Sequence, residues 1–151
     1  MLELKIPPVA LFMVTFLIMG IVSAVLPVAS FTLPGASAVA SVLAFAGAGI
    51  AVAGVYAFRR HGTTVNPMKP ETTVSVVIVG IYRFTRNPMY LGLAVILVGW
   101  AIYLTNVVAM LLVPAFVAYM TEFQIKPEER ALRAKFGPGF ADYMLEVRRW
   151  I

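Results

Sequence analysis

Two long stretches of the sequence contain no Asp, Glu, Lys, Arg or His, and they restrict the fold more than any other feature. They run from residue 6 to 58 and from residue 87 to 121. The chain is 61% hydrophobic and 13% charged, whereas soluble domains are about 25% charged. Apolar runs of this length are typical of membrane spans, and in hydrocarbon a helix satisfies its own backbone polar groups. The sequence therefore predicts an all-α integral membrane protein.

The first stretch is long enough for two spans of about 20 residues each. Two prolines, a glycine and small polar residues interrupt it at PVASFTLPG, residues 27–35, and such residues mark a turn. We expect helices near 8–26 and 37–58. The first apolar run, at roughly 20 residues, exceeds the 7–15 residues of a signal-peptide core, which favours a retained helix. The second helix is rich in Ala and Gly. It either packs centrally, because small residues let helices approach closely in lipid, or is simply an apolar span.

The second stretch predicts a helical hairpin, because Thr105 and Asn106 break it near the middle. Arms of about 16–17 residues reach only about 25 Å, short of a hydrocarbon core about 30 Å thick. The bilayer must therefore thin there, or the flanking charges must move to the headgroup boundary. With the first two spans, the hairpin makes about four transmembrane helices.

All twelve Lys and Arg residues fall on one side of this topology. The loops at 27–36 and 105–106 contain none, the connection 59–86 contains five and the tail 122–151 contains six, and Lys5 is the twelfth. Because Lys and Arg are enriched in cytoplasmic loops, we expect both termini and the active site on the cytoplasmic face of the inner (plasma) membrane. The chain then forms a single domain of two spans, a connection, a hairpin and a cytoplasmic tail (1–58, 59–86, 87–121 and 122–151).

Two segments outside the spans also carry apolar residues. Residues 74–82 are too short to span as a helix, so we expect them at the interface or buried in protein. In the tail, a helix is expected to start at Pro127 and to end at FGPG, followed by a second helix over 139–150. The second helix has an apolar stripe, which predicts docking on the membrane or on the hairpin (Phe140, Tyr143, Met144 and Val147).

A charged turn, RFTRNPMYLG, precedes the hairpin at residues 83–92. Asn87 is a strong N-cap for a helix that starts at Pro88, and free N–H groups at such a start favour a carboxylate or phosphate. Gly92, one turn further, lets a ligand or another helix approach closely. The alternative is that each arginine and tyrosine here is an ordinary residue of the membrane interface (Tyr82, Arg83, Arg86 and Tyr90).

Two adjacent acids, Glu128 and Glu129, lie in the first turn of the expected tail helix. The helix macrodipole alone would account for acids at this place. If the tail folds back, however, they supply a seat for a cation beside the seat for an anion at the turn. The turn and the acid pair would then form one niche for a ligand that carries both an ammonium and a carboxylate group.

The composition excludes several kinds of site. The chain has no cysteine and a single histidine, His61, which argues against a disulfide, a metal centre and a Ser-His-Asp triad. We expect His61 to be a solvated loop residue. Basic loops beside spans account for the net charge of +5, so no nucleic-acid partner is expected.

Two motifs around the hairpin resemble one family of membrane enzymes. GIYRFTRNPMYLGL and KPEERALRAKFGPGFADYMLEVRRWI are similar to the isoprenylcysteine carboxyl methyltransferase and phospholipid methyltransferase family. The resemblance implies S-adenosyl-L-methionine as cofactor, bound between hairpin and tail. By position, the implied cofactor-binding residues are Arg86, Asn87, Pro88, Tyr90, Gly92, Glu128 and Glu129. Four arginines are the catalytic candidates, and the last two match terminal basic positions near the methyl acceptor (Arg83, Arg86, Arg148 and Arg149).

One position departs from the family pattern. Asn87 stands where the family most often has His, which argues against a proton shuttle there. The scarcity of bases favours a lipophilic acceptor that is already anionic, such as an isoprenylcysteine-like carboxylate, which enters from the bilayer and its lipids. The alternatives are a phospholipid-amine methyltransferase, an NADPH-dependent sterol-type reductase and a non-catalytic small membrane protein. The short chain speaks against the reductase, and the uncharged spans speak against an ion path.

Overall fold

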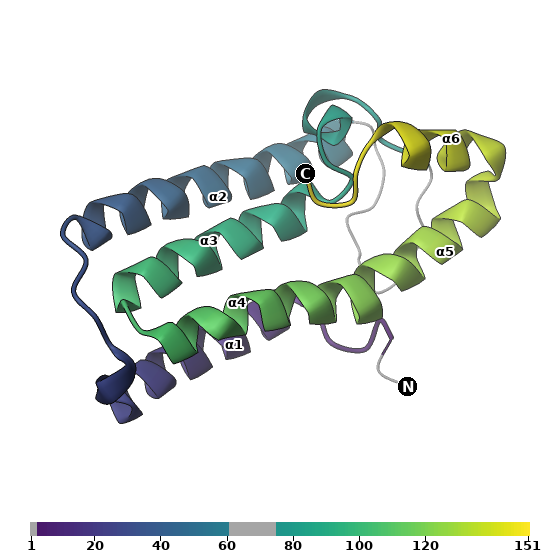
Figure 1. Cartoon of the computed structure of the whole chain (residues 1–151). Helices are drawn as coiled ribbons and strands as arrows, with labels where there is room; N and C mark the ends of the chain where they lie inside the picture. The colour runs from purple at the N-terminus through teal and green to yellow at the C-terminus, as the bar shows by residue number, and fades with distance from the viewer. Residues whose placement is uncertain (1–2, 61–74) are drawn as a thin grey trace.

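The computed structural model describes residues 3–60 and 75–151, and the regular secondary structure of this part is helical. Its apolar helices are α1 (Pro8–Val25), α2 (Ala36–Arg60), α3 (Pro88–Leu104) and α4 (Val107–Tyr119), which run alongside one another (Figure 1). Three helices are long and apolar enough to cross a membrane, namely α1, α2 and the helix that begins with α4, and α3 is shorter. The chain is an all-α membrane helical protein, as predicted, and the bounds of α1 and α2 agree closely with the expected ones.

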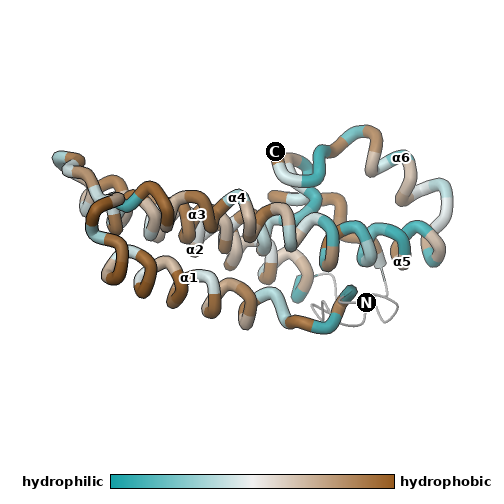
Figure 2. The backbone as a smooth tube through the Cα atoms, turned by 60° about the horizontal axis from the view of Figure 1, so that its bottom comes forward, coloured by the Kyte–Doolittle hydropathy of each residue, from teal (hydrophilic) through white to brown (hydrophobic). Residues whose placement is uncertain are grey.

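The two ends of this bundle differ in charge. Both chain termini lie at the same end as α5 (Lys126–Phe136) and α6 (Pro138–Glu146), and the connections α1–α2 and α3–α4 lie at the opposite end (Figure 1). Hydrophobic residues dominate the four spans, whereas hydrophilic residues gather along α5 (Figure 2). We call the end that holds α5, α6 and both termini the charged end, and the opposite end the uncharged end. This arrangement agrees with the expected topology, and which compartment faces the charged end stays a prediction.

Small residues bring α2 and α3 into close contact. A methyl group on Gly92 of α3 would lie 2.4 Å from the carbonyl oxygen of Gly47 of α2, and a methyl group on Gly99 would lie 3.0 Å from the carbonyl oxygen of Ala40. Near the charged end, Gly54 leaves room for Met89 in the same way. The small residues of α2 therefore serve close packing against α3, which is one of the two interpretations of its composition.

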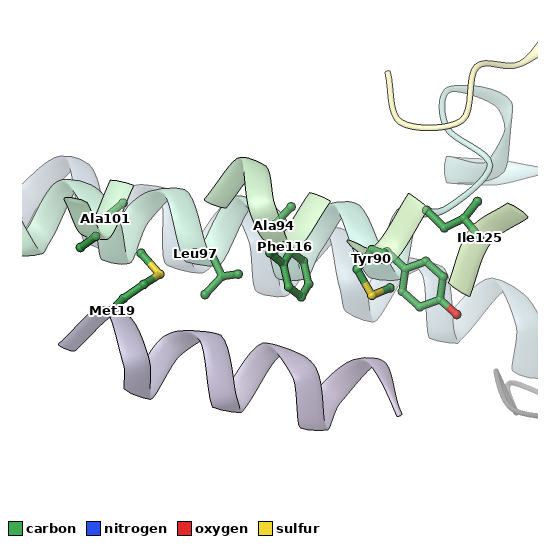
Figure 3. Close-up of a cluster of buried hydrophobic side chains, with 9 residues drawn as sticks. Met19, Tyr90, Ala94, Leu97, Ala101, Phe116 and Ile125 are labelled. Carbon is green, nitrogen blue, oxygen red and sulfur yellow. The ribbon is translucent and has the colours of Figure 1, made fainter. Parts of the chain in front are cut away.

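A hydrophobic core lies on the other side of α3. Met19 of α1, Leu97 of α3 and Phe116 of α4 are all at most 2% exposed, and they meet between these three helices (Figure 3). Tyr90 and Ile125 extend the same core toward the charged end. This core holds the start of α3 against the helix that follows α4.

Side-chain hydrogen bonds of Asn106 stabilise the uncharged end of the bundle. Asn106 is fully buried, and its side-chain oxygen accepts a hydrogen bond from the N–H of Ala109 (3.0 Å), which caps α4. Its side-chain amide donates to the carbonyl of Leu26 (2.9 Å) and to the hydroxyl of Ser30 (3.1 Å). The sequence had indicated only a break at this residue. The structure shows that Asn106 also joins the two connections at this end.

The second arm of the hairpin is longer than expected. After α4 the chain forms a π-helical segment, Met120–Ile125, and continues without interruption into α5, so that one helix runs from Val107 to Phe136. The expected start of a tail helix at Pro127 agrees with the start of α5 at Lys126, but α5 continues the helix of α4 and is not separate from it. Pro127 has no N–H for the carbonyl of Phe123 four residues earlier, and that carbonyl instead accepts a bond from the N–H of Leu4 (3.0 Å). A contact from the N-terminal segment thus replaces the missing helical bond.

The chain then turns back at α6. Its buried residues Phe140, Tyr143 and Val147 pack against α5 and against Val76, and not against the hairpin as one expectation had it. The helix also ends earlier than expected, because Val147 is already extended (φ −118°, ψ 131°). Residues 147–151 lead back toward the start of α3. In the segment that precedes the turn, Val77 is 4% exposed, whereas Ile78 and Val79 are 52% and 44% exposed, so this segment is buried only in part.

Candidate active site

The turn before α3 meets the C-terminal residues through backbone and amide contacts. The N–H of Arg86 donates to the carbonyl of Arg148 (3.1 Å), and the side-chain amide of Asn87 donates to the carbonyl of Arg149 (2.9 Å). Asn87 does occupy the position before Pro88, but its side chain makes no capping bond, so the expected side-chain cap is wrong. The amide is committed to the returning C-terminal segment instead.

Glu129 pairs with two arginines that come from distant parts of the sequence. One of its oxygens lies 3.0 Å from a terminal nitrogen of Arg86, and Arg149 donates to both oxygens, through Nε (3.0 Å) and a terminal nitrogen (2.7 Å). The side chains of Arg86 and Glu129 are 9% and 10% exposed. Hydrogen bonding to Glu129 raises the pKa of Arg149, whereas burial lowers the pKa of Arg86. A bidentate pair of this kind is strong and holds a fixed geometry.

This contact both confirms and corrects the predicted niche. The turn and the acidic pair do meet, since Arg86 touches Glu129. The space between these two residues is closed by the ion pair itself, so the expectation of an open niche between them is wrong. Burying an unpaired guanidinium or carboxylate group would destabilise the fold. Arg86 and Glu129 therefore pair directly with each other.

Glu128 has a different environment from its neighbour. One oxygen of Glu128 accepts hydrogen bonds from the hydroxyl of Tyr90 (2.6 Å) and from the side-chain amide of Gln124. Both donors are neutral, and no cation pairs with Glu128 among residues 3–60 and 75–151. Gln124 lies one helical turn before Glu128, and Tyr90 lies in the first turn of α3. Among the described residues, Glu128 is therefore a buried carboxyl group that neutral donors hold in place and that no positive charge contacts.

Two buried donors of the turn lack an acceptor in the part of the chain that the structure describes, the hydroxyl of Tyr82 and Nε of Arg86. Tyr82 is 4% exposed, its ring lies 5.2 Å from that of Phe58, and its carbonyl accepts from the hydroxyl of Tyr143 (2.7 Å). Burial, with smaller contributions from Tyr143 and Glu128, raises the pKa of Tyr82, so its hydroxyl keeps its proton. An unsatisfied buried group costs about 1–3 kcal/mol, and such groups are often those that meet a ligand. The sequence had grouped Tyr82 with the residues of the turn, with a place at the membrane interface as the alternative, and had given it no specific role.

The remaining sequence-predicted residues lie around this cluster. Arg83 is exposed and lines a cavity of about 660 Å³ together with Asp142 and Glu146 of α6. The side chain of Arg148 is exposed, and its carbonyl is the part that contacts the turn. The side chains of these two arginines thus point to places outside the Arg86–Glu129 contact.

The two small residues of the turn are committed to packing. Pro88 is fully buried against Gly54, and Gly92 faces Gly47 of α2. Of the two roles expected for Gly92, the close approach of another helix is therefore the one observed. His61 lies outside the described residues. In the described residues, no group of three or more His, Cys, Asp or Glu side chains could hold a metal ion.

A second, smaller cavity lies beside the Arg149–Glu129 pair. It measures about 250 Å³, and four of its six lining residues are cationic (Lys126, Arg130, Arg133 and Arg149). Glu129 and Met144 complete the lining. Lys126, Arg130 and Arg149 already pair with Glu122, Glu3 and Glu129, and the positive charge that remains, with Arg133, suits a carboxylate or another anion. The cluster thus offers an uncompensated carboxylate at Glu128 and a cationic cavity one residue further along the same helix.

The family model for phospholipid methyltransferases matches residues 36–139, which is more than half of the chain. The chain belongs to the phospholipid methyltransferase family. The match includes the turn and the acid pair, and it confirms the resemblance seen in the two motifs. An uncharacterized protein of Haemophilus influenzae is 43% identical over 63 residues, which cover 42% of this chain and all of that relative. No solved structure matches the chain.

Proposed function

We propose that this protein is an S-adenosyl-L-methionine-dependent methyltransferase that acts on a lipophilic acceptor at the charged end of the bundle. Methyltransferases of this family use S-adenosyl-L-methionine. The observation that carries the proposal is the environment of Glu128. Among the described residues, its carboxyl group accepts hydrogen bonds from two neutral donors, the hydroxyl of Tyr90 and the side-chain amide of Gln124. A carboxylate in this setting is suited to an ammonium group, which supplies the missing charge.

The donors around Glu128 fit the rest of the methionyl group. The hydroxyl of Tyr82 has no acceptor among the described residues, and as an oxygen it could itself accept from the same ammonium. The free Nε–H of Arg86 and the cationic cavity beside Arg149 suit the carboxylate. Glu129 is less suited to the ammonium, because two arginines already compensate its charge. Of the two adjacent acids, we therefore assign the ammonium to Glu128.

When bound, S-adenosyl-L-methionine supplies a methyl group that an acceptor oxygen takes as the carbon–sulfur bond breaks, its electron pair passing to sulfur. The chain's own residues then have to align the partners and exclude water, an effect that can contribute about 7–11 kcal/mol. The ion pairs of Glu129 with Arg86 and Arg149 would hold the walls of the site in place for this alignment. The exposed Arg83 and Arg148 are the candidates for orienting the acceptor's charged group.

Apart from Glu128, which this proposal assigns to the ammonium group, the described site contains no free base, and this favours an acceptor that is already anionic. Burial raises the pKa of Tyr143 to about 12 and also raises that of Tyr82, and Glu129 is committed to its arginines. A carboxylate needs no deprotonation before it accepts a methyl group, whereas a protonated amine does. We therefore place an isoprenylcysteine-like carboxylate first. A phospholipid amine is the second candidate, which the family's description as phospholipid methyltransferase favours.

Binding of radiolabelled S-adenosyl-L-methionine to the detergent-solubilised protein tests the site. Glu128→Gln should weaken binding at least about 30-fold, since removing one partner of a desolvated charge pair costs about 2–5 kcal/mol. Glu122→Gln is the matched control, because Glu122 lies on the same continuous helix, is 54% exposed and forms an exposed ion pair with Lys126. Equal binding by wild type and Glu128→Gln, or binding of NADPH in place of the methyl donor, would contradict the proposal.

The chemistry of the product separates the two acceptors. Transfer of labelled methyl to a farnesylcysteine analogue gives an ester, which alkali hydrolyses with release of labelled methanol. Transfer to phosphatidylethanolamine gives an N-methyl group, which alkali leaves in place. Alkali-labile product alone supports the carboxylate, and alkali-stable product alone supports the amine. The proposed orientation, with the charged end in the cytoplasm, rests on the positive-inside distribution of Lys and Arg.

A further inference from the structure

The teal segment beside the end of α2 in Figure 1, residues 78–84, exposes three large apolar side chains. Ile78, Val79 and Phe84 are 52%, 44% and 78% exposed, and they flank the short 3-10 helix Gly80–Arg83. Tyr82, inside this helix, is 4% exposed, so the segment has one side buried in protein and another that is apolar and exposed. We call Ile78, Val79 and Phe84 the apolar rim. Neighbouring exposed apolar side chains of this kind indicate a contact with another molecule or with a membrane.

Contacts with α2 fix the depth of this segment. The ring of Tyr82 lies 5.2 Å from the ring of Phe58, and α2 ends immediately afterwards with Arg59 and Arg60. The charge-free part of α2, residues 36–58, is about 34 Å long, slightly more than a hydrocarbon core of about 30 Å. Phe58 and Tyr82 therefore lie close to the boundary between the hydrocarbon and the headgroups.

The start of α3 fixes the depth of the other end of the segment. Pro88 packs against Gly54 of α2, which lies about 6 Å further into the bundle than Phe58. Phe84 precedes Pro88 by one short turn, so it stays within reach of both levels. Over this same interval of α2, Tyr56 is 63% exposed, and around a spanning helix the neighbour at this depth is lipid.

The charges beside the apolar rim suit the headgroup layer. Arg83 is exposed and, within residues 3–60 and 75–151, forms no ion pair, although Asp142 and Glu146 line the same cavity. Arg59 and Arg60 are also exposed at the end of α2. Water would solvate these arginines but leave the rim exposed, and hydrocarbon would do the reverse. The headgroup layer, where anionic phosphates lie next to acyl chains, suits both.

We infer that the apolar rim inserts into the lipid leaflet at the charged end, where its side chains contact acyl chains and Arg83 faces lipid phosphates. The occupant of this surface is phospholipid of the surrounding bilayer, and not a soluble protein or a second copy of the chain. The contact adds a peripheral anchor to the four spans, at the segment that leads into the turn. It goes beyond the proposed function and does not require that the protein bind S-adenosyl-L-methionine.

Nitroxide labels on single cysteines measure this depth directly, because the chain contains no cysteine of its own. Ile78→Cys and Phe84→Cys are each spin-labelled and reconstituted into vesicles of phosphatidylcholine with phosphatidylglycerol. Collisions of the label with oxygen, which concentrates in hydrocarbon, are then compared with collisions with a water-soluble nickel chelate. Lipid contact gives a high oxygen-to-nickel ratio, water gives a low ratio, and contact with protein suppresses both kinds of collision.

Two exposed positions calibrate the scale. Phe45→Cys is the lipid reference, since Phe45 is 81% exposed in the central part of α2. Ala134→Cys is the aqueous reference, since Ala134 is exposed on α5 beyond the spans. We expect the oxygen-to-nickel ratios at positions 78 and 84 to lie above that of Ala134→Cys and below that of Phe45→Cys. Val79→Cys provides a third position of the rim, and unchanged helical circular dichroism shows that each labelled variant is folded.

Two results would overturn the inference. Ratios at the rim equal to that of Ala134→Cys would show that water covers it. Low collision rates with both reagents would show that protein covers it, and dipolar broadening between labels would then identify a second copy of the chain. These measurements are made without S-adenosyl-L-methionine, so a protein that fails to bind the methyl donor can still support the lipid contact, and a rim exposed to water leaves the proposed function standing.

Discussion

The contact between α2 and α3 gives the sharpest prediction for the fold, through the substitution Gly92→Ala. The added methyl carbon would lie 2.4 Å from the carbonyl oxygen of Gly47 and 2.8 Å from Cβ and N of Ala51. These distances fall about 1 Å short of an ordinary contact. The obstructing atoms belong mostly to backbone, so no rotamer change relieves the clash and the helices must separate. A gap of 0.5–1 Å forfeits roughly a quarter to a half of each dispersion contact that it opens.

The expected magnitude follows from two opposing terms. Overpacking of this kind costs about 1–3 kcal/mol, and we expect the upper end because backbone is involved. The gain in helix propensity from Gly to Ala returns at most about 1 kcal/mol. Gly92→Ala should therefore lower the free energy of unfolding by about 2 kcal/mol. Gly49→Ala is the matched control, because nothing lies within 4 Å of the added methyl group, and it should be neutral or slightly stabilising.

The assay is the loss of helical circular dichroism as SDS is added to the protein in mixed micelles. Gly92→Ala should unfold at a lower SDS fraction than wild type, and Gly49→Ala should not. The same variant should bind S-adenosyl-L-methionine more weakly, since Tyr90 lies half a turn from Gly92 and would shift relative to Glu128. If Gly92→Ala and Gly49→Ala unfold at the same SDS fraction, the close approach of α2 and α3 described above is refuted.

Three further predictions concern polar contacts. Asn106→Ala should destabilise the protein by about 2–3 kcal/mol in the SDS assay, since it removes the cap of α4 and leaves buried groups unpaired. Ser30→Ala, which loses one hydrogen bond with Asn106, should cost less than half as much. Glu129→Gln should lower the free energy of unfolding by about 3–5 kcal/mol, because it leaves two arginines facing a neutral group in a largely buried site. Glu122→Gln, in the exposed pair, should lower it by less than about 1 kcal/mol. Equal effects of the two substitutions would contradict the burial of the Arg86–Glu129 pair. Burial raises the pKa of Tyr143 in the folded protein from its ordinary value of about 10 to about 12, so its contribution to stability is complete below pH 10 and is lost as the pH rises through 12. Phenolate absorbance near pH 10.5 should be the same for wild type and Tyr143→Phe, and a clear difference there would show that Tyr143 titrates normally.

The positions of the spans could be predicted from the sequence because lipid permits few solutions. Charge-free runs must form helices, and the breaks at 27–35 and 105–106 carry residues that favour turns. The meeting of Arg86 with the acid pair was expected on the condition that the tail folds back. Each of these inferences depends on a property that the sequence expresses locally or through a simple return of the chain.

The residues whose partners are distant could not be placed in this way. Asn87 has the sequence context of a cap, but the carbonyl of Arg149 takes its amide. Pro127 has the context of a helix start, but the N–H of Leu4 satisfies the carbonyl that Pro127 leaves free. In both cases a tertiary contact outweighed the local preference. The pairing of Glu129 with Arg149, which leaves Glu128 with neutral partners, likewise depends on where α6 ends.

The π-helical segment Met120–Ile125 sets the direction in which the acid pair points. Such a segment accommodates about one more residue than an α-helical turn, and one residue corresponds to a rotation of about 100°. If the same residues formed a regular α-helix instead, Glu128 and Glu129 would turn by about that angle, away from Tyr90 and Arg86. The π-helical segment therefore sets the direction of the two carboxylates, and a homologous chain with one residue fewer at this point can present them to the same side through an ordinary α-helical turn.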